Sequence, residues 1–259
     1  MGAESEAKRG WEHRVNVLDL FSGIGGFSLG LERAGMRTTA FCEIDPFCRK
    51  VLARHWPGVP IYDDIRKLDG IYYAGAVDLV CGGFPCQDLS VGHTWTEARG
   101  LDGERSGLWF EFQRLIGEIR PRWAIIENVS ILRSRGLDTV LGSLAEIGYD
   151  AEWHCIAASA LGARHERDRV WIVAHPAGER VEGLWPEGIQ IAHPLAHPFL
   201  PLRDRNGEWQ AEPDVCRVAD GVPDRAHRLK AVGNAVVPQI PEFIGRAILA
   251  YERQLGLAA

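Results

Sequence analysis

The sequence lacks the features that mark exported, membrane-spanning and disulfide-bonded proteins. None of its apolar runs approaches the roughly 18 residues that a transmembrane helix needs. The stretch from Met1 to Arg14 is polar and charged, without the apolar core of a secretory signal. The six cysteines, at positions 42, 48, 81, 86, 155 and 216, contain no CxxC pair. We therefore expect a cytoplasmic protein with reduced thiols.

Basic residues are not in excess, and the glycine pattern of nicotinamide-binding domains is missing. The chain has 29 Lys and Arg against 35 Asp and Glu, which gives a formal net charge of −6. This balance argues against a nonspecific coat for nucleic acid but leaves room for one basic groove. The glycines after the first predicted strand do not follow the G-x-G-x-x-G spacing, so a nicotinamide cofactor is not expected.

An alternation of strands and helices runs from Arg14 to about Ala174. It predicts an α/β fold with a mostly parallel sheet and helices on both faces. Apolar runs mark the strands, and apolar residues three or four apart mark the helices. The predicted strands are 15–20, 38–42, a short one ending at 64, 77–81, 123–126, 149–157 and 169–174. The predicted helices are 27–34, 46–56, 108–119 and 238–255.

The composition changes after this alternating region. Residues 177–216 carry many prolines and little periodicity, and the helical pattern returns only near the end of the chain. We expect residues 1–176 to form the core, 177–216 a short loop-rich insert and 217–259 a segment that returns to the core. His193 and His197 have the spacing of a zinc helix, but Pro194 and Pro198 exclude that helix, so no metal site is expected.

A glycine-rich turn follows the first predicted strand and opens a helix. In Asp19-Leu20-Phe21-Ser22-Gly23-Ile24-Gly25-Gly26, the glycines would let a ligand approach N–H groups at the positive helix end. Glu43 ends the next strand, where a carboxylate can bind both hydroxyls of a ribose. The combination favours a nucleoside site over a plain tight turn. Asp64 could accept a hydrogen bond from an adenine amino group, although alone it would be interpreted as a turn residue.

Two further strands predict a thiol and a carboxylate at one edge of the sheet. Strand 77–81 leads into Gly82-Gly83-Phe84-Pro85-Cys86-Gln87, and strand 123–126 leads into Glu127-Asn128-Val129. We expect both groups in loops at the strand carboxyl ends, where chemistry gathers in parallel sheets. A Cys beside a carboxyl suggests a covalent nucleophile with a proton-handling partner. Arg167 and Arg169 could lower the thiol pKa, although alone they would indicate only a solvated charged loop.

In this order, the motifs resemble those of the DNA cytosine-5 methyltransferases over nearly the whole chain apart from the insert. The glycine turn is similar to that family's S-adenosylmethionine loop, and Gly83-Phe84-Pro85-Cys86-Gln87 to its nucleophile loop. Glu127-Asn128-Val129 resembles the acidic partner, Arg167-Asp168-Arg169 the paired-arginine segment, and Gly233-Asn234 with Val236 the closing cofactor motif. The resemblance implies a Rossmann-like, S-adenosylmethionine-dependent methyltransferase fold of prokaryotic or phage type.

The resemblance also implies a reaction, the transfer of a methyl group to C5 of a cytosine flipped out of double-stranded DNA. Cys86 would add to C6, and Glu127 would grip N3 and the exocyclic amine. Arg169 would bind O2, and Arg167 would steady the site and a nearby phosphate. Residues 91–106 would form a loop that closes over the DNA. The implied cofactor-binding residues are Phe21, Gly23, Gly25, Gly26, Glu43, Ile44, Asp64, Ile65, Pro85, Leu108, Asn234 and Ala235.

The sequence departs from the family pattern in ways that leave alternatives open. His165 stands where the family usually has Gln, and Ala235 where it often has Ser. The insert is short for a module that reads several base pairs through the major groove, so specificity could be low, could reach few bases or could depend on a second chain. A cognate restriction endonuclease is another possible partner. The alternative functions are a catalytically silent DNA-binding relative and an RNA cytosine-5 methyltransferase, although the Cys-Phe-Thr tripeptide typical of the tRNA-acting branch is missing.

Overall fold

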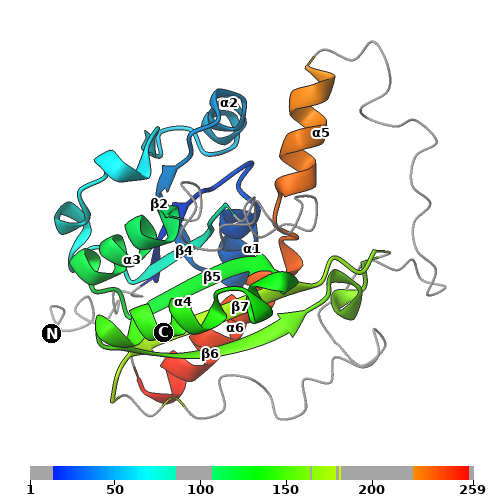
Figure 1. Ribbon diagram of the computed structural model, residues 1–259. Coiled ribbons are helices and arrows are strands. Elements are labelled where there is room, and N and C mark those ends of the chain that lie inside the picture. The colour runs from blue at the N-terminus through cyan, green and yellow to red at the C-terminus, as the bar shows by residue number, and fades with distance from the viewer. Residues whose placement is uncertain (1–13, 86–106, 164, 179–180, 182–223, 257–259) are drawn as a thin grey trace, which may run out of the picture.

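The computed structural model describes residues 14–85, 107–163, 165–178, 181 and 224–256. Seven strands form one sheet in the order β3-β2-β1-β4-β5-β7-β6 (Figure 1). Neighbours from β3 to β5 pair in parallel, whereas β7 pairs antiparallel with both β5 and β6. The predicted mostly parallel α/β fold is therefore confirmed. The strands are β1 Asn16–Leu20, β2 Arg37–Cys42, β3 Ile61–Tyr62, β4 Leu79–Gly83, β5 Trp123–Val129, β6 Tyr149–Ile156 and β7 Arg169–Pro176.

Helices cover both faces of this sheet, because successive strand side chains point to opposite sides. On one face Leu18, Val80 and Ile126 pack with residues of α3 and α4. On the other face Val17 and Ile125 pack with residues of α1 and α6. Figure 1 shows α3 and α4 in front of the sheet and α1 and α6 behind it. The helices are α1 Gly26–Ala34, α2 Pro46–His55, α3 Leu108–Ile119, α4 Leu137–Glu146, α5 Arg225–Asn234 and α6 Gln239–Gln254.

Local sequence explains where several helices begin and end. The Asp45 side chain accepts a hydrogen bond from Phe47 N at 2.8 Å, and Pro46 takes the first position of α2, as predicted. Gly35 ends α1 with a φ of 113°, a conformation that strongly favours glycine. None of the helices in the described ranges is long and apolar enough to cross a membrane.

Two strands extend further than expected. β4 includes Gly82 and Gly83, and β5 runs on to Val129, so the prediction that Glu127 lies in a loop is wrong. The reason is that β7 pairs with the last residues of β5, with Val129 opposite Arg169. The ladder holds Glu127 in an extended strand between Gly83 and Trp171.

Two helices were not predicted. α4 follows the 3-10 turn η5 (Ser130–Ser134), and α5 lies in the segment expected to return to the core after the insert. Gly233 and Asn234 are the last residues of α5, and the predicted last helix, α6, begins after Pro238. Ala231 is the buried residue among those of α5 whose side chains are described, so this helix offers no apolar stripe to recognise.

Candidate active site

Backbone N–H groups and one carboxylate shape the turn after β1. The buried Glu43 carboxylate accepts from Gly23 N at 2.7 Å and from Asp45 N at 2.6 Å. Gly23 has a φ of 54°, and the preceding Phe21 has a φ of 52°. A Cβ built on Gly23 would meet nothing within 4 Å, so the space over the turn is open. Glu43 therefore joins the end of β2 to the glycine turn, a contact that the sequence did not predict.

Asp19 supports the same turn from inside the core. Its side chain is fully buried, and Oδ2 accepts from the Ser28 hydroxyl at 2.7 Å and from Ser28 N at 3.3 Å. Burial raises the pKa of Asp19 from 3.8 to about 7, although the hydrogen bonds from Ser28 oppose the shift. The other carboxylate oxygen has no hydrogen-bond partner among the described residues.

The residues expected around an adenine come from two turns, one after β3 and one after β1. Asp64 begins the 3-10 turn η1 (Ile65–Lys67), and Ile65 is buried in the core. The Asp64 carboxylate accepts from Arg66 N at 3.0 Å and pairs with the Arg66 guanidinium at 2.8 Å, which lowers the Asp64 pKa. The ring of Phe21 lies 6.1 Å from that of Phe112 on α3. Ile44, another of the implied cofactor-binding residues, is 67% exposed, whereas Ile65 is buried.

Glu127 and Arg169 form an ion pair at the carboxyl end of β5. Arg169 Nε lies 3.0 Å from Glu127 Oε1, and the Glu127 side chain is only 13% exposed. A Cβ at the facing Gly83 would lie 2.7 Å from Glu127 Oε2, so glycine makes room for the carboxyl. Burial raises the Glu127 pKa, and the charges of Arg169 and Arg167 oppose that rise. The structure therefore brings two of the predicted catalytic residues together.

Asn128, to which the sequence analysis gave no separate role, fixes the adjacent turn. Its buried amide donates to the Phe84 carbonyl at 3.2 Å, and its oxygen accepts from Val129 N at 2.8 Å. The contact joins β5 to the residue before Pro85, itself half-buried. The sequence feature that could have indicated this structural role is an Asn at the end of a buried strand, since a buried amide requires hydrogen-bond partners.

Arg167 contacts the segment between α5 and α6. Its guanidinium donates to the carbonyls of Gly233 at 2.9 Å and Ala235 at 2.7 Å. Burial, followed by the charge of Arg169, lowers the Arg167 pKa. The linker also lies against the start of α1, since a Cβ at Gly26 would sit 2.5 Å from the Val236 carbonyl oxygen. The structure thus brings the segment that contains Asn234 and Ala235 near the glycine turn through Val236 and joins it to Arg167 through Gly233 and Ala235.

Some predicted features lie outside the described residues. These are Cys86, the 91–106 loop and most of the 177–216 insert. Pro85, the sequence neighbour of Cys86, follows β4 at the edge where Gly83 faces Glu127. Leu108 is half-buried at the first position of α3. Within the described ranges, no group of three or more His, Cys, Asp and Glu side chains could hold a metal ion.

Comparisons with known proteins agree with this arrangement. Residues 15–199 match the family model for C-5 cytosine-specific DNA methylase. Over 62% of this chain, the sequence is 39% identical to the type II methyltransferase M2.BsuMI of Bacillus subtilis, covering 42% of that protein. It is 33% identical to the type II methyltransferase M.Eco47II of Escherichia coli over 66% of this chain and 42% of that protein.

A solved structure extends the likeness of the fold to nearly the whole chain. The Entamoeba histolytica methyltransferase EhMeth superposes with a TM-score of 0.65 over 94% of this chain and 99% of that chain, at 13% identity. The chain spans under half the length of M2.BsuMI and M.Eco47II, the two curated relatives named above. The chain belongs to the C-5 cytosine-specific DNA methylase family.

Proposed function

We propose that this protein transfers a methyl group from S-adenosyl-L-methionine to C5 of cytosine in double-stranded DNA. The observation that carries the proposal is the order of strands at the site. β4, which leads towards Cys86, pairs with β1 and its glycine turn on one side and with β5 and Glu127 on the other. A nucleophile at this position would face both a nucleoside-binding turn and a carboxyl.

The residues around the turn fit an adenosine-containing cofactor. Gly23 leaves open space and Glu43 offers a carboxylate for the ribose. The Asp64 carboxylate, which accepts from Arg66 N, Nε and Nη2, would exchange one of these contacts for an adenine amino group. Phe21, Ile65 and Leu108 would supply apolar contact. When bound, S-adenosyl-L-methionine supplies an electrophilic methyl group on sulfur. The chain's own residues would bind and orient this group and exclude water from it.

The chemistry follows from the poor nucleophilicity of cytosine C5. The Cys86 thiolate would add to C6, and the electron pair of the C5–C6 double bond would then be available at C5 for attack on the methyl carbon. The bond between that carbon and sulfur would break, with S-adenosylhomocysteine as the leaving group. Loss of the C5 proton to a base and expulsion of the Cys86 thiolate would restore the ring. The base must leave the duplex stack first, at a cost of a few kcal/mol.

Glu127 and Arg169 would handle the charge that develops on the ring. A raised Glu127 pKa favours a carboxyl that can give a proton to N3 as Cys86 adds. Arg169 holds the Glu127 carboxyl at 3.0 Å and would also donate to the cytosine O2. Arg167, which donates to the carbonyls of Gly233 and Ala235, would fix the position of this cofactor-binding segment relative to the base site.

The proposal is tested by trapping the covalent adduct. The protein is incubated with tritiated S-adenosylmethionine and duplex DNA that contains cytosine or 5-fluorocytosine, and the products are separated on a denaturing gel. A labelled protein–DNA band only with the fluorinated base is expected, because fluorine at C5 cannot leave as a proton does. Cys86→Ser should lose the band and all transfer to normal DNA. Glu127→Gln should slow transfer by about 100-fold or more.

The same experiment separates the alternatives. Cofactor binding without label on any DNA would point to a silent relative or to a required second chain. Label on RNA but not on DNA would point to an RNA methyltransferase. Full activity in Cys86→Ser would overturn the covalent mechanism, since no other thiol is proposed to add to C6. If a second chain or a cognate endonuclease accompanies the protein, it would supply specificity and not the nucleophile.

A further inference from the structure

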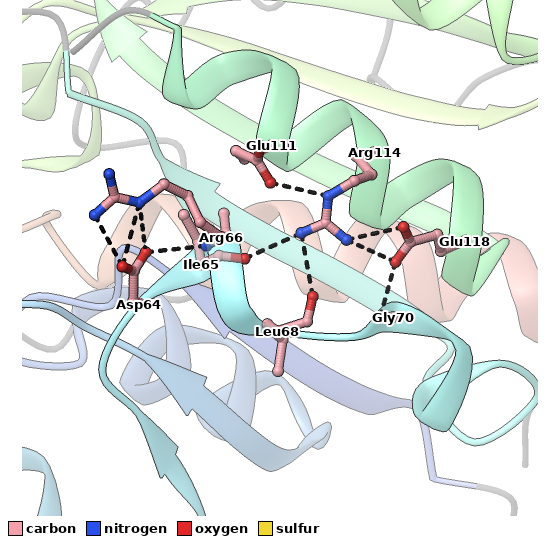
Figure 2. Close-up of polar contacts among 8 residues, drawn as sticks. All are labelled: Asp64, Ile65, Arg66, Leu68, Gly70, Glu111, Arg114 and Glu118. Atoms are coloured by element: carbon pink, nitrogen blue, oxygen red, sulfur yellow. Dashed lines mark hydrogen bonds and ion pairs between the residues drawn. The ribbon is translucent and has the colours of Figure 1, made fainter. Parts of the chain in front are cut away.

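Arg114 on α3 uses all of its guanidinium N–H groups on neighbouring residues. Nε donates to Glu111 at 2.9 Å, and Nη1 donates to both carboxylate oxygens of Glu118 at 2.8 Å. Nη2 donates to the backbone carbonyls of Ile65 and Leu68 at 3.1 Å each (Figure 2). A guanidinium carries five donors in a planar fork, so these bonds fix the two carbonyls relative to α3.

Glu118 adds a third backbone contact to the same segment. Its Oε2 accepts from Gly70 N at 2.9 Å, as well as from Arg114. A Cβ at Gly70 would lie 2.8 Å from that oxygen, so a larger residue would not fit without a shift. The Arg114 and Glu118 side chains are 33% and 27% exposed, so their contacts are partly shielded from water. The pair therefore holds residues 65–70 at three backbone atoms.

The clamped segment is the one that carries the proposed adenine contacts. Arg114 grips the carbonyl of Ile65, the residue immediately after Asp64 (Figure 2). α3 also begins with Leu108, and its Phe112 packs near Phe21. Leu108 and Phe21 are the other apolar residues proposed to contact the adenosine part of the cofactor. One helix thus supports several parts of the adenine side.

We propose that Arg114 and Glu118 are positioning residues for the adenine end of the cofactor site. They set where Asp64 and Ile65 stand without touching the cofactor themselves. This inference rests on the proposed function of those two residues. Loss of the hydrogen bonds from Arg114 and Glu118 to residues 65–70 should weaken cofactor binding and reduce the preference for an adenine amino group. The rate of methyl transfer at saturating cofactor should stay within about twofold of wild type.

The test measures binding of two ligands by isothermal titration calorimetry. S-adenosylhomocysteine carries the adenine amino group, and S-inosylhomocysteine has a carbonyl oxygen in its place. Wild type should prefer the first. Arg114→Gln should weaken S-adenosylhomocysteine about tenfold and S-inosylhomocysteine far less, so that the preference collapses. Asp64→Asn should reproduce that collapse, and Arg114→Lys should resemble Arg114→Gln because an ammonium cannot span the same acceptors.

Arg246→Gln is the matched control. It removes another Arg–Glu pair at i,i+4 spacing, between Arg246 and Glu242 on α6 at 2.8 Å, and should leave both affinities unchanged. Equal weakening of both ligands by Arg114→Gln, or no weakening, would overturn the positioning role. If that variant fails a check by circular dichroism, Glu118→Gln carries the same test. Failure of wild type to bind S-adenosylhomocysteine would instead count against the proposed function itself.

Discussion

At the scale of single residues, Asp19 makes stability depend on pH. Its ordinary pKa is 3.8 and burial raises it to about 7 in the folded protein. As pH rises from about 4 to 7, the unfolded chain therefore gives up a proton that the folded chain still holds. The unfolded state binds fewer protons in this window, so the free energy of unfolding falls with rising pH. The stabilising effect is complete below pH 3.8 and is lost once the pH passes about 7.

Asp19→Asn should remove this dependence because an amide does not titrate. We expect the variant to gain about 3 kcal/mol of stability relative to wild type as the pH rises from 5 to 8. The Asn oxygen can still accept from Ser28 N and from its hydroxyl. Urea unfolding of both proteins at each pH provides the measurement. Parallel stability curves for the two proteins would show that Asp19 stays ionised throughout.

At the scale of elements, the close approach of α1 and the start of α6 requires a glycine at position 30. A Cβ at Gly30 would lie 2.2 Å from the Pro238 carbonyl oxygen and 2.8 Å from Pro241 Cγ. Gly30→Ala should force α6 away and cost about 1–3 kcal/mol, despite the better helix propensity of alanine. For the control, Gly142→Ala in α4 adds a Cβ with nothing within 4 Å and should stabilise by about 0.5–1 kcal/mol.

In thermal unfolding, the midpoint of Gly30→Ala should fall below that of wild type and the midpoint of Gly142→Ala should rise above it. A chain of this size shifts its midpoint by about 2–4 °C for each kcal/mol. An unchanged or higher midpoint for Gly30→Ala would contradict the packing described for Gly30, and a lower midpoint for Gly142→Ala would contradict the open space described at Gly142. Because Pro238 follows the linker that Arg167 holds, Gly30→Ala should also weaken cofactor binding.

The elements differ in how far the sequence predicts them. The strand around Leu18, buried on both faces, reads as an apolar run and was predicted at nearly the right bounds, whereas β5, around Ile125, was predicted with the right start but three residues too short. α4 carries Leu137, Val140 and Leu144 at helical spacing, so the sequence does contain a signal for this helix. α5 exposes most of its described side chains and therefore gives no comparable signal.

The features of the candidate site also differ in how far the sequence predicts them. Motif order predicted which residue types gather at the sheet edge, including Glu127 with Arg169. It did not predict that Glu127 lies inside a strand, because the pairing with β7 joins residues far apart in sequence. Nor could it predict that Arg167 donates to the carbonyls of Gly233 and Ala235, since a backbone oxygen leaves no mark in sequence.

At the scale of the whole molecule, charge limits how the chain can hold DNA. The net charge is −6, and the 177–216 insert contains seven acidic residues against three basic ones. Phosphate contacts by Lys and Arg supply essentially all of nonspecific DNA affinity and make it depend on salt. With few cations available in the insert, little of that affinity can arise there. The segment is therefore a poor candidate for a self-sufficient recognition module.

We accordingly expect the purified chain to bind duplex DNA weakly, with a Kd of about 1 μM or higher at physiological salt, and to discriminate little between sequences. Fluorescence anisotropy with a labelled duplex, repeated from 50 to 200 mM salt, gives both the affinity and the number of phosphates contacted. The slope of log K against log salt should be shallow, because it is about −0.9 for each phosphate neutralised. Nanomolar binding to one defined sequence with a steep slope would show that the insert recognises DNA alone. Weak binding would mean that selectivity has to come from a second polypeptide, and adding that polypeptide should raise affinity for one sequence without changing the adduct at Cys86.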